Sequence, residues 1–243
     1  MTDFKNLSLS RLRKMARAGQ QILECYRLLG KTDANVVGEV LEGQGEFYEW
    51  DHYPPGDVFD HETNAQYYYH AHPPEGRAEK FGAEHGHFHT FLRPKGMPRN
   101  IRPAKVLDFE KPEGDNDALT HFVGIAMSPG GFPTRLFTTN RWVTGEVWYK
   151  ASSVISLIDR FSMDLAYPSL PVNIWITGML QLFRPDIEKL LMERDQAVQE
   201  WLDKHPGENV YEDRGLEITS IQDISVEKQI KLVNKALKAA KTG

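Results

Sequence analysis

Apolar residues near the start of the chain recur at steps of three and four positions, which is the spacing of one face of a helix. After Ser8, the recurring positions are Leu12, Met15, Ile22, Tyr26 and Leu29. Gly30 follows them, and glycine commonly ends a helix. A second, shorter run over residues 36–41 stops before Gly43. We therefore expect a helical part over residues 8–43.

The next part of the chain, residues 46–150, alternates between apolar and polar positions instead. A period of two turns successive side chains to opposite faces of a strand. The alternation is clearest over residues 67–72, 85–92, 119–127 and 133–139. The turn sequence Ser128-Pro-Gly-Gly131 joins the last two of these segments as a hairpin. Together they predict an antiparallel sheet, either curved or barrel-like.

Helical spacing returns in the last part of the chain, residues 151–243. The expected helices cover residues 153–163, 173–183 and 187–202. A short strand is expected over residues 216–221, and Ser225 caps a final helix. We therefore expect one α+β domain over residues 1–243, in which helices from both ends of the chain cover the sheet.

The predicted sheet carries most of the histidines. Seven of the nine lie between residues 52 and 89. His70 and His72 share one strand face, and His85, His87 and His89 share one face of the next alternating segment. Histidines one residue apart lie ~6.6 Å apart along a strand, close enough to share one ion. These five histidines are the candidate metal ligands.

Imidazole is a common protein ligand of zinc, copper and iron. His85 and His89 lie ~13 Å apart along a strand, whereas a metal–nitrogen bond is about 2 Å long. We therefore expect one His-x-His pair from each segment to surround one ion. The fifth histidine would act as an acid, a base or a supporting hydrogen-bond partner. The alternative is a set of half-buried, hydrogen-bonding strand residues.

Other polar residues near the cluster have a structural explanation as well as a chemical one. Asp57, Asp60 and His61 could supply further ligand atoms, but aspartate also binds its own backbone in turns. His121 begins the predicted hairpin on the same face as Val123. We expect it in the core or at its rim, and it joins the site only if this strand borders the histidine strands.

Composition restricts the function further. The formal net charge of -5 argues against a general nucleic-acid binder. Cys25 is the single cysteine and cannot form an intramolecular disulfide, and the chain begins without an apolar signal region. No stretch has the uninterrupted apolar length of a membrane span. We expect a cytoplasmic protein that binds neither nucleic acid nor membranes.

Basic and aromatic residues predict that the protein binds a small anionic molecule. Five basic and no acidic residues occur in the thirteen positions from Arg93. Arg135 and Arg141 lie in a segment rich in aromatic residues, which could form the wall of a pocket. Tyr68, with its neighbouring tyrosines and Trp50, could form an aromatic lining near a bound iron or copper ion. The alternative is a basic surface loop and a sheet edge with solvent-facing arginines.

The leading hypothesis is a metalloenzyme that acts on a small molecule. Iron or copper would give an oxygen-using oxidoreductase, whereas zinc would give a hydrolase that activates water. The excess of histidine over acidic residues in the cluster favours iron or copper. His87 and His85 are the expected catalytic residues. Glu75 or Glu84 could act as a base, although strand parity turns Glu84 away from the histidine face.

The seven residues His85-Gly-His-Phe-His-Thr-Phe91 resemble the His-x-His-x-His-x-x signature of the histidine triad family of nucleotide hydrolases and transferases. The resemblance implies that His87 attacks phosphorus and that His85 and His89 assist it. It also implies that the basic run from Arg93 faces phosphate. Two spacer positions, a glycine and a threonine, differ from the hydrophobic spacers of that family.

Two further interpretations rest on the same residues. The histidine strand could hold a metal or a haem without catalysis, with Phe88 and Phe91 against the porphyrin, although no CxxCH haem-attachment motif is present. The His-x-His pairs also fit the barrel of the cupin family, but the spaced Glu, Gly and later His of its motifs are not where that family has them. The concentration of histidines in one region favours one defined site over metal storage.

Overall fold

The computed structural model describes residues 4–73, 84–107, 109–110 and 112–241. It is an α+β structure built on one six-stranded antiparallel sheet. The strands are β1 (Tyr53–Phe59), β2 (Ala65–His70), β3 (Gly86–Leu92), β4 (Thr120–Met127), β5 (Pro133–Thr139) and β6 (Ile218–Asp223). They lie side by side in chain order, so β1 and β6 are the two edges. Among the described strands the sheet is therefore open and is not closed into a barrel.

Helices from both ends of the chain accompany the sheet, as predicted. They are α1 (Leu9–Leu29), α2 (Val36–Leu41), α4 (Arg141–Thr144), α5 (Ala151–Leu157), α6 (Leu170–Leu182), α7 (Arg184–Lys204) and α8 (Val226–Ala239). Serine residues cap α1 and α8, and the cap of α8 was predicted. The Ser8 hydroxyl accepts the Arg11 backbone N–H at 3.2 Å, and the Ser225 hydroxyl accepts that of Lys228 at 3.3 Å. These hydrogen bonds satisfy N–H groups that the first helical turn leaves without a partner.

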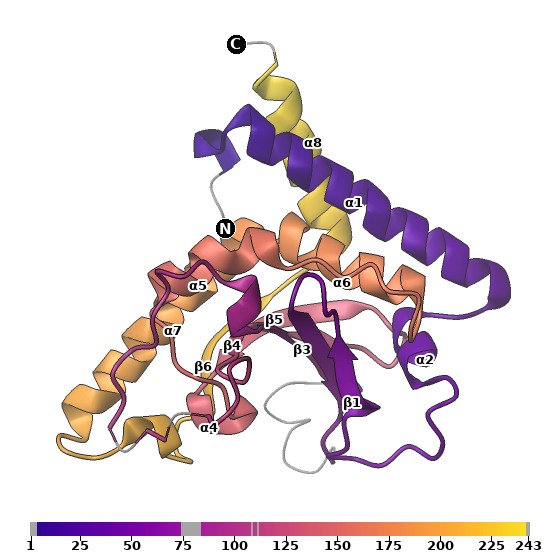
Figure 1. Ribbon diagram of the computed structural model, residues 1–243. Helices are drawn as coiled ribbons and strands as arrows, with labels where there is room; N and C mark the ends of the chain where they lie inside the picture. Colours follow the sequence, from indigo (N-terminus) through magenta and orange to yellow (C-terminus); the bar gives the residue numbers. More distant parts are fainter. Residues whose placement is uncertain (1–3, 74–83, 108, 111, 242–243) are drawn as a thin grey trace.

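One face of the sheet packs against a layer of helices. Figure 1 shows α1 and α8 crossing above α6, with the sheet below them, and α7 beside β6. Phe88 of β3 meets Trp175 of α6 with ring centroids 5.5 Å apart. The Tyr67 hydroxyl of β2 donates a 2.6 Å hydrogen bond to the side-chain carbonyl of Asn173. Burial of these aromatic rings fixes which face of β2 and β3 points toward the helices.

The opposite face of the same strands carries the histidines. Alternation places Tyr68 and His70 of β2 on this face, opposite His89 and His87 of β3. Phe137 of β5 lies over Gly124 of β4, and its ring is 5.3 Å from the ring of His87. This face is also covered, because His89 is only 1% exposed.

The predicted elements near the C-terminus have somewhat different bounds in the structure, and α7 extends beyond the expected range 187–202 at both ends. The helix expected over 153–163 begins at Ala151 and is α5, followed by a 3₁₀ turn over Ile158–Arg160. The helix expected over 173–183 begins at Leu170, because proline is accepted in the first turn of α6. The strand expected over 216–221 is shifted to Ile218–Asp223.

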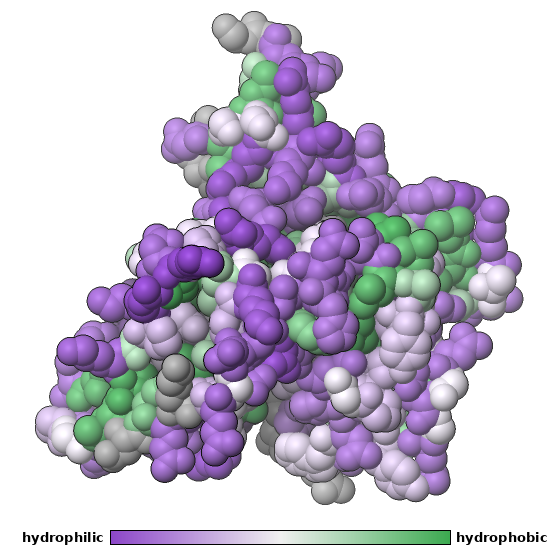
Figure 2. Space-filling view, in the orientation of Figure 1, coloured by the Kyte–Doolittle hydropathy of each residue, from purple (hydrophilic) through white to green (hydrophobic). Residues whose placement is uncertain are grey.

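The helices are amphipathic or short. Within the described ranges, no helix combines the length and the apolar character needed to cross a membrane. Figure 2 shows a mainly hydrophilic surface on one side of the molecule, with apolar residues in smaller groups, one of them over the lower end of α7. Scattered groups of this kind are normal on protein surfaces.

Gly124 tests how the histidine face is packed. A Cβ atom at this position would overlap the ring of Phe137. We therefore expect Gly124→Ala to displace that ring and to lower the free energy of unfolding by about 1–3 kcal/mol, as overpacking does. Urea unfolding measures this change. The control is Gly130→Ala, where a Cβ would meet its nearest atom at 3.6 Å. Equal stability of the two variants would contradict the described packing.

Candidate metal centre

Three histidines converge at the end of β2 and the start of β3. His70 and His87 are cross-strand partners, and their Nε2 atoms lie 2.7 Å apart. One ring nitrogen from each of His70, His72 and His87 lies within 4.8 Å of the other two. Nitrogens at this spacing can reach a common ion, since a zinc–nitrogen bond is about 2 Å long. We call these three residues the three-histidine cluster.

His72 belongs to the cluster although β2 ends two residues before it. The backbone N–H of Trp50 donates to the carbonyl of Ala71 at 2.9 Å, which keeps the chain extended past the strand. The ring centroid of His72 lies 4.7 Å from that of His70 and 5.1 Å from that of His87. The prediction that His70 and His72 share a face is therefore confirmed.

Glu84 contacts His87, contrary to the orientation expected from strand parity. The Nδ1 atom of His87 lies 2.7 Å from Oε1 of Glu84, and Oε2 of Glu84 lies 3.7 Å from Arg135. Strand parity gave the wrong orientation for Glu84, because β3 begins only at Gly86 and parity does not extend beyond the strand. A carboxylate on one ring nitrogen orients the other nitrogen toward a metal and makes it a better ligand.

His85 does not share the face of His87, so the prediction that the two lie on one strand face was wrong. It precedes β3, and its Nδ1 atom lies 2.6 Å from the hydroxyl of Tyr69, whose ring packs on the helix side of the sheet. The ring of Phe47 also lies near the His85 ring, with the two ring centroids 5.8 Å apart. Partial burial lowers the pKa of His85. The segment 85–89 therefore contributes one residue, His87, to the three-histidine cluster.

His89 and His121 form a buried pair next to the cluster. His89 Nδ1 lies 3.0 Å from His121 Nε2, and the His89 ring lies 4.9 Å from that of His87. Both side chains are about 1% exposed. Burial is the main cause that lowers the pKa of His89 well below its ordinary value and that of His121 to about 3. The lowered pKa values favour the neutral form of both rings at neutral pH. Of the two, His89 lies directly beside His87 of the cluster.

A β-bulge explains why His121 was expected on the wrong face. Thr90 pairs with Val123, but the next residue of β3, Phe91, pairs with His121. The bulge leaves Phe122 as an extra residue in β4 and turns His121 to the face opposite Val123. A bulge of one residue has no clear signal in the alternation of apolar and polar positions.

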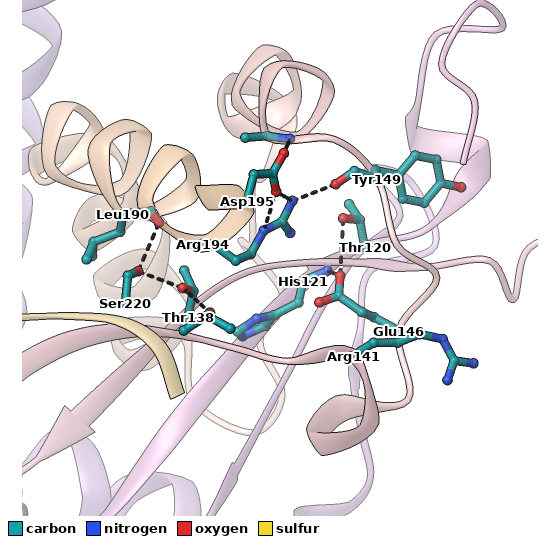
Figure 3. A network of polar contacts seen from close by, with 12 residues as sticks. Thr120, His121, Thr138, Arg141, Glu146, Tyr149, Leu190, Arg194, Asp195 and Ser220 are labelled. Carbon is teal, nitrogen blue, oxygen red and sulfur yellow. Dashed lines mark hydrogen bonds and ion pairs between the residues drawn. The ribbon is translucent and has the colours of Figure 1, made fainter. Parts of the chain in front are cut away.

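Glu146 is a buried carboxylate that sequence reasoning did not single out. One of its oxygens accepts the backbone N–H of His121 at 2.7 Å, and burial raises its pKa to about 7. Arg194 of α7 lowers this pKa in part and donates to the carbonyl of Tyr149 at 2.6 Å. Figure 3 shows this network between α7 and the start of β4. The available sequence signal was a lone acid beside the apolar run 147–149.

A pocket of about 460 Å³ opens beside the cluster. Its lining residues are Trp50, His70, His72, Pro73, Trp142, Val143, Arg214 and Glu217. Two of the three clustered histidines therefore face a space that accepts a small molecule. The prediction that the aromatic segment after Arg135 walls a pocket is met by Trp142 and Val143.

The residues predicted to bind a cofactor or an anion lie elsewhere. Arg93 pairs with Asp117 at 2.8 Å, Arg141 with Glu212, and Arg135 with Asp223 and Glu84. Tyr68 stacks on His52, with ring centroids 3.6 Å apart. None of these four residues is among the described residues that line the pocket.

The remaining candidate ligands have local roles. Asp57 lies 3.0 Å from His52 Nδ1. Asp60 accepts the backbone N–H groups of Glu62 and Thr63, which is the turn chemistry that its sequence predicted. His61 is exposed and packs against Phe59. Glu75, the other candidate base, lies outside the described residues.

Glu146 generates a prediction about pH. Folding raises its pKa from 4.5 to about 7, so the native state keeps a proton that the unfolded state releases. Stability from this group therefore falls as the pH rises from about 4.5 to 7. Glu146→Gln removes the charge, and we expect it to gain up to about 3 kcal/mol relative to the parent between pH 4 and pH 8. Urea unfolding at each pH measures this difference. A constant difference would contradict the raised pKa, and Glu62→Gln is the exposed control.

Comparison with known proteins leaves the activity open. No curated protein and no solved structure matches the chain significantly. One family model matches residues 16–224, and its description is Domain of unknown function (DUF6969). The matched span contains all six strands and every residue of the three-histidine cluster. The chain belongs to the DUF6969 family.

Proposed function

We propose that the protein binds one transition-metal ion through His70, His72 and His87 and is an enzyme that acts on a small molecule. The observation that supports this best is the convergence of three imidazole nitrogens within 4.8 Å at the wall of a pocket. Three protein ligands leave a coordination position for water or substrate, which is the usual arrangement of a catalytic metal site.

The surroundings of the cluster support metal binding over use of His87 as a nucleophile. One nitrogen of His87 faces Glu84 and the other faces His70, each at 2.7 Å. His87 is not among the described residues that line the pocket, and neither is any residue of the basic segment 93–105. The phosphoryl-transfer function that the histidine triad resemblance implies therefore receives less support than metal binding.

Iron or copper is the metal that we favour, with an oxidoreductase activity. The cluster consists of imidazoles, which iron, copper and zinc all accept as ligands. Trp50, Trp142 and Val143 give the pocket largely apolar walls, which suit an organic substrate and dioxygen. When bound, such a metal would supply redox chemistry, while the residues of the pocket would hold and orient the substrate.

A zinc hydrolase is the second candidate, and Glu217 favours it. This carboxylate lines the pocket together with His70 and His72, where it could accept a proton from water. Zinc lowers the pKa of a bound water molecule, and a nearby carboxylate is then a suitable base.

Metal analysis distinguishes these candidates. Element-specific mass spectrometry and an absorption spectrum should be recorded on protein purified without an affinity tag or added metal. Near-stoichiometric iron or copper would support the oxidoreductase, and zinc would support the hydrolase. A Soret band would instead indicate haem. Absence of metal after reconstitution would refute the proposed function and direct work to nucleotide hydrolysis.

Ligand variants test the three-histidine cluster. We expect His72→Gln and His87→Gln each to lose most of the bound metal, because each removes one of three ligands, while the fold is largely kept. Metal content per chain and circular dichroism are the measurements. His61→Gln is the matched control, since His61 is exposed and outside the cluster. Full metal content in both cluster variants would place the metal elsewhere.

Glu84 should tune the affinity of the site without being a ligand. We expect Glu84→Ala to weaken metal binding about 10- to 100-fold, the usual effect of removing a carboxylate that supports a ligating histidine. Competition with a chelator of known affinity measures this change. Glu62→Ala should leave the affinity unchanged, because Glu62 is exposed and belongs to a turn. If the two variants bind metal equally well, Glu84 has no role in the site.

We also propose a cytoplasmic protein that does not act on nucleic acids or membranes. Cys25 is buried in α1, and burial raises the pKa of its thiol to about 11. A thiol of this kind is inert in a reducing compartment. The formal net charge of -5 disfavours attraction to nucleic acid or to anionic lipid surfaces.

A further inference from the structure

Arg214 differs from the three arginines that the sequence predicted to bind an anion. Each of those three has a carboxylate partner: Asp117 for Arg93, Asp223 and Glu84 for Arg135, and Glu212 for Arg141. Arg214 lines the pocket beside His70 and His72. Within the described part of the chain it has no carboxylate at ion-pair distance and no hydrogen-bond acceptor. Its positive charge is thus available to a ligand.

The guanidinium group of Arg214, an exposed residue, lies over the ring of Trp142. The central carbon of that group lies 4.2 Å from the centroid of the Trp142 ring. The ring is itself fixed, because its Nε1–H donates to the carbonyl of Leu216 at 2.9 Å. Stacking on the ring leaves the N–H groups at the edge of the guanidinium free to bind in its plane. An arginine ordered in advance loses less entropy when a ligand binds.

Trp50 provides a second aromatic wall with an unusual backbone. Its φ angle is +72°, in the left-handed region that residues other than glycine rarely adopt. Its side chain is 62% exposed, and its ring meets the ring of His72 edge-on at 4.3 Å. A large exposed aromatic residue in a costly backbone conformation, next to a pocket, is typical of a ligand-binding position.

We propose that the pocket binds a small organic carboxylate. Its carboxylate group pairs with Arg214, and its apolar part lies between Trp50 and Trp142, beside the three-histidine cluster. The guanidinium fork matches the two oxygens of a carboxylate. Arg214 supplies one positive charge, which matches a singly charged carboxylate better than a phosphate monoester with about two negative charges. This inference rests on the proposed function and names its substrate class.

Binding of three related probes tests the proposal. Benzoate, its neutral analogue benzamide and phenyl phosphate are titrated into the full-length protein by isothermal calorimetry. We expect benzoate to bind most tightly. Arg214→Gln should weaken benzoate binding about 10- to 100-fold, as loss of charged hydrogen bonds does, and should leave benzamide binding unchanged. Arg13→Gln, an exposed arginine of α1, is the matched control.

The results separate this proposal from the metal site. Benzoate binding that is absent at millimolar concentration, that survives Arg214→Gln, or that is weaker than phenyl phosphate binding would overturn the carboxylate assignment. The metal content of each sample is measured in parallel. Arg214-dependent benzoate binding to metal-free protein, after failed reconstitution, would refute the metal centre and leave the carboxylate pocket standing. If the protein contains bound metal and benzoate binding does not depend on Arg214, the carboxylate assignment is refuted and the metal centre stands.

Discussion

The register between β2 and β3 determines the arrangement of the whole site. This strand pair has no bulge, and it places His70 opposite His87. A shift of one residue would turn the histidines toward the helices and the aromatic residues away from them. Tyr67 and Phe88 prevent that shift because they are anchored to α6 through Asn173 and Trp175. The apolar packing on one face therefore fixes the arrangement of the histidines on the other.

The two faces of the sheet bury very different groups. The helix side buries aromatic and aliphatic residues, whereas the other side buries His89, His121 and Glu146. Burial disfavours the charged form of each of these groups, and their pKa values move accordingly. Glu84 and Arg135 keep opposite charges close to each other at the edge of this region. Burial thus favours the neutral forms of His89, His121 and Glu146, whereas an ion pair lies at the edge of this region.

Sequence periodicity predicted the strands and the histidine-bearing face but not every side chain on it. Alternation was sufficient for His70, His72 and His87, which lie on or just beyond regular strands. It failed for Glu84 and His85, which precede β3, and for His121, which a bulge turns over. Arg214 had no signal at all, because an arginine in a loop fits no periodic pattern. The chain fold alone brings it to the pocket.

The position of Glu146 affects more than the stability of the fold. The formal net charge of -5 counts every acidic side chain as ionised. Because burial raises its pKa to about 7, Glu146 keeps its proton in part of the molecules near neutral pH. The protein near pH 7 is therefore a mixture of two species that differ by one proton in the interior. Small changes in solution pH near 7 alter the proportions of these two species. The proton concerned lies on Glu146, next to the backbone of His121.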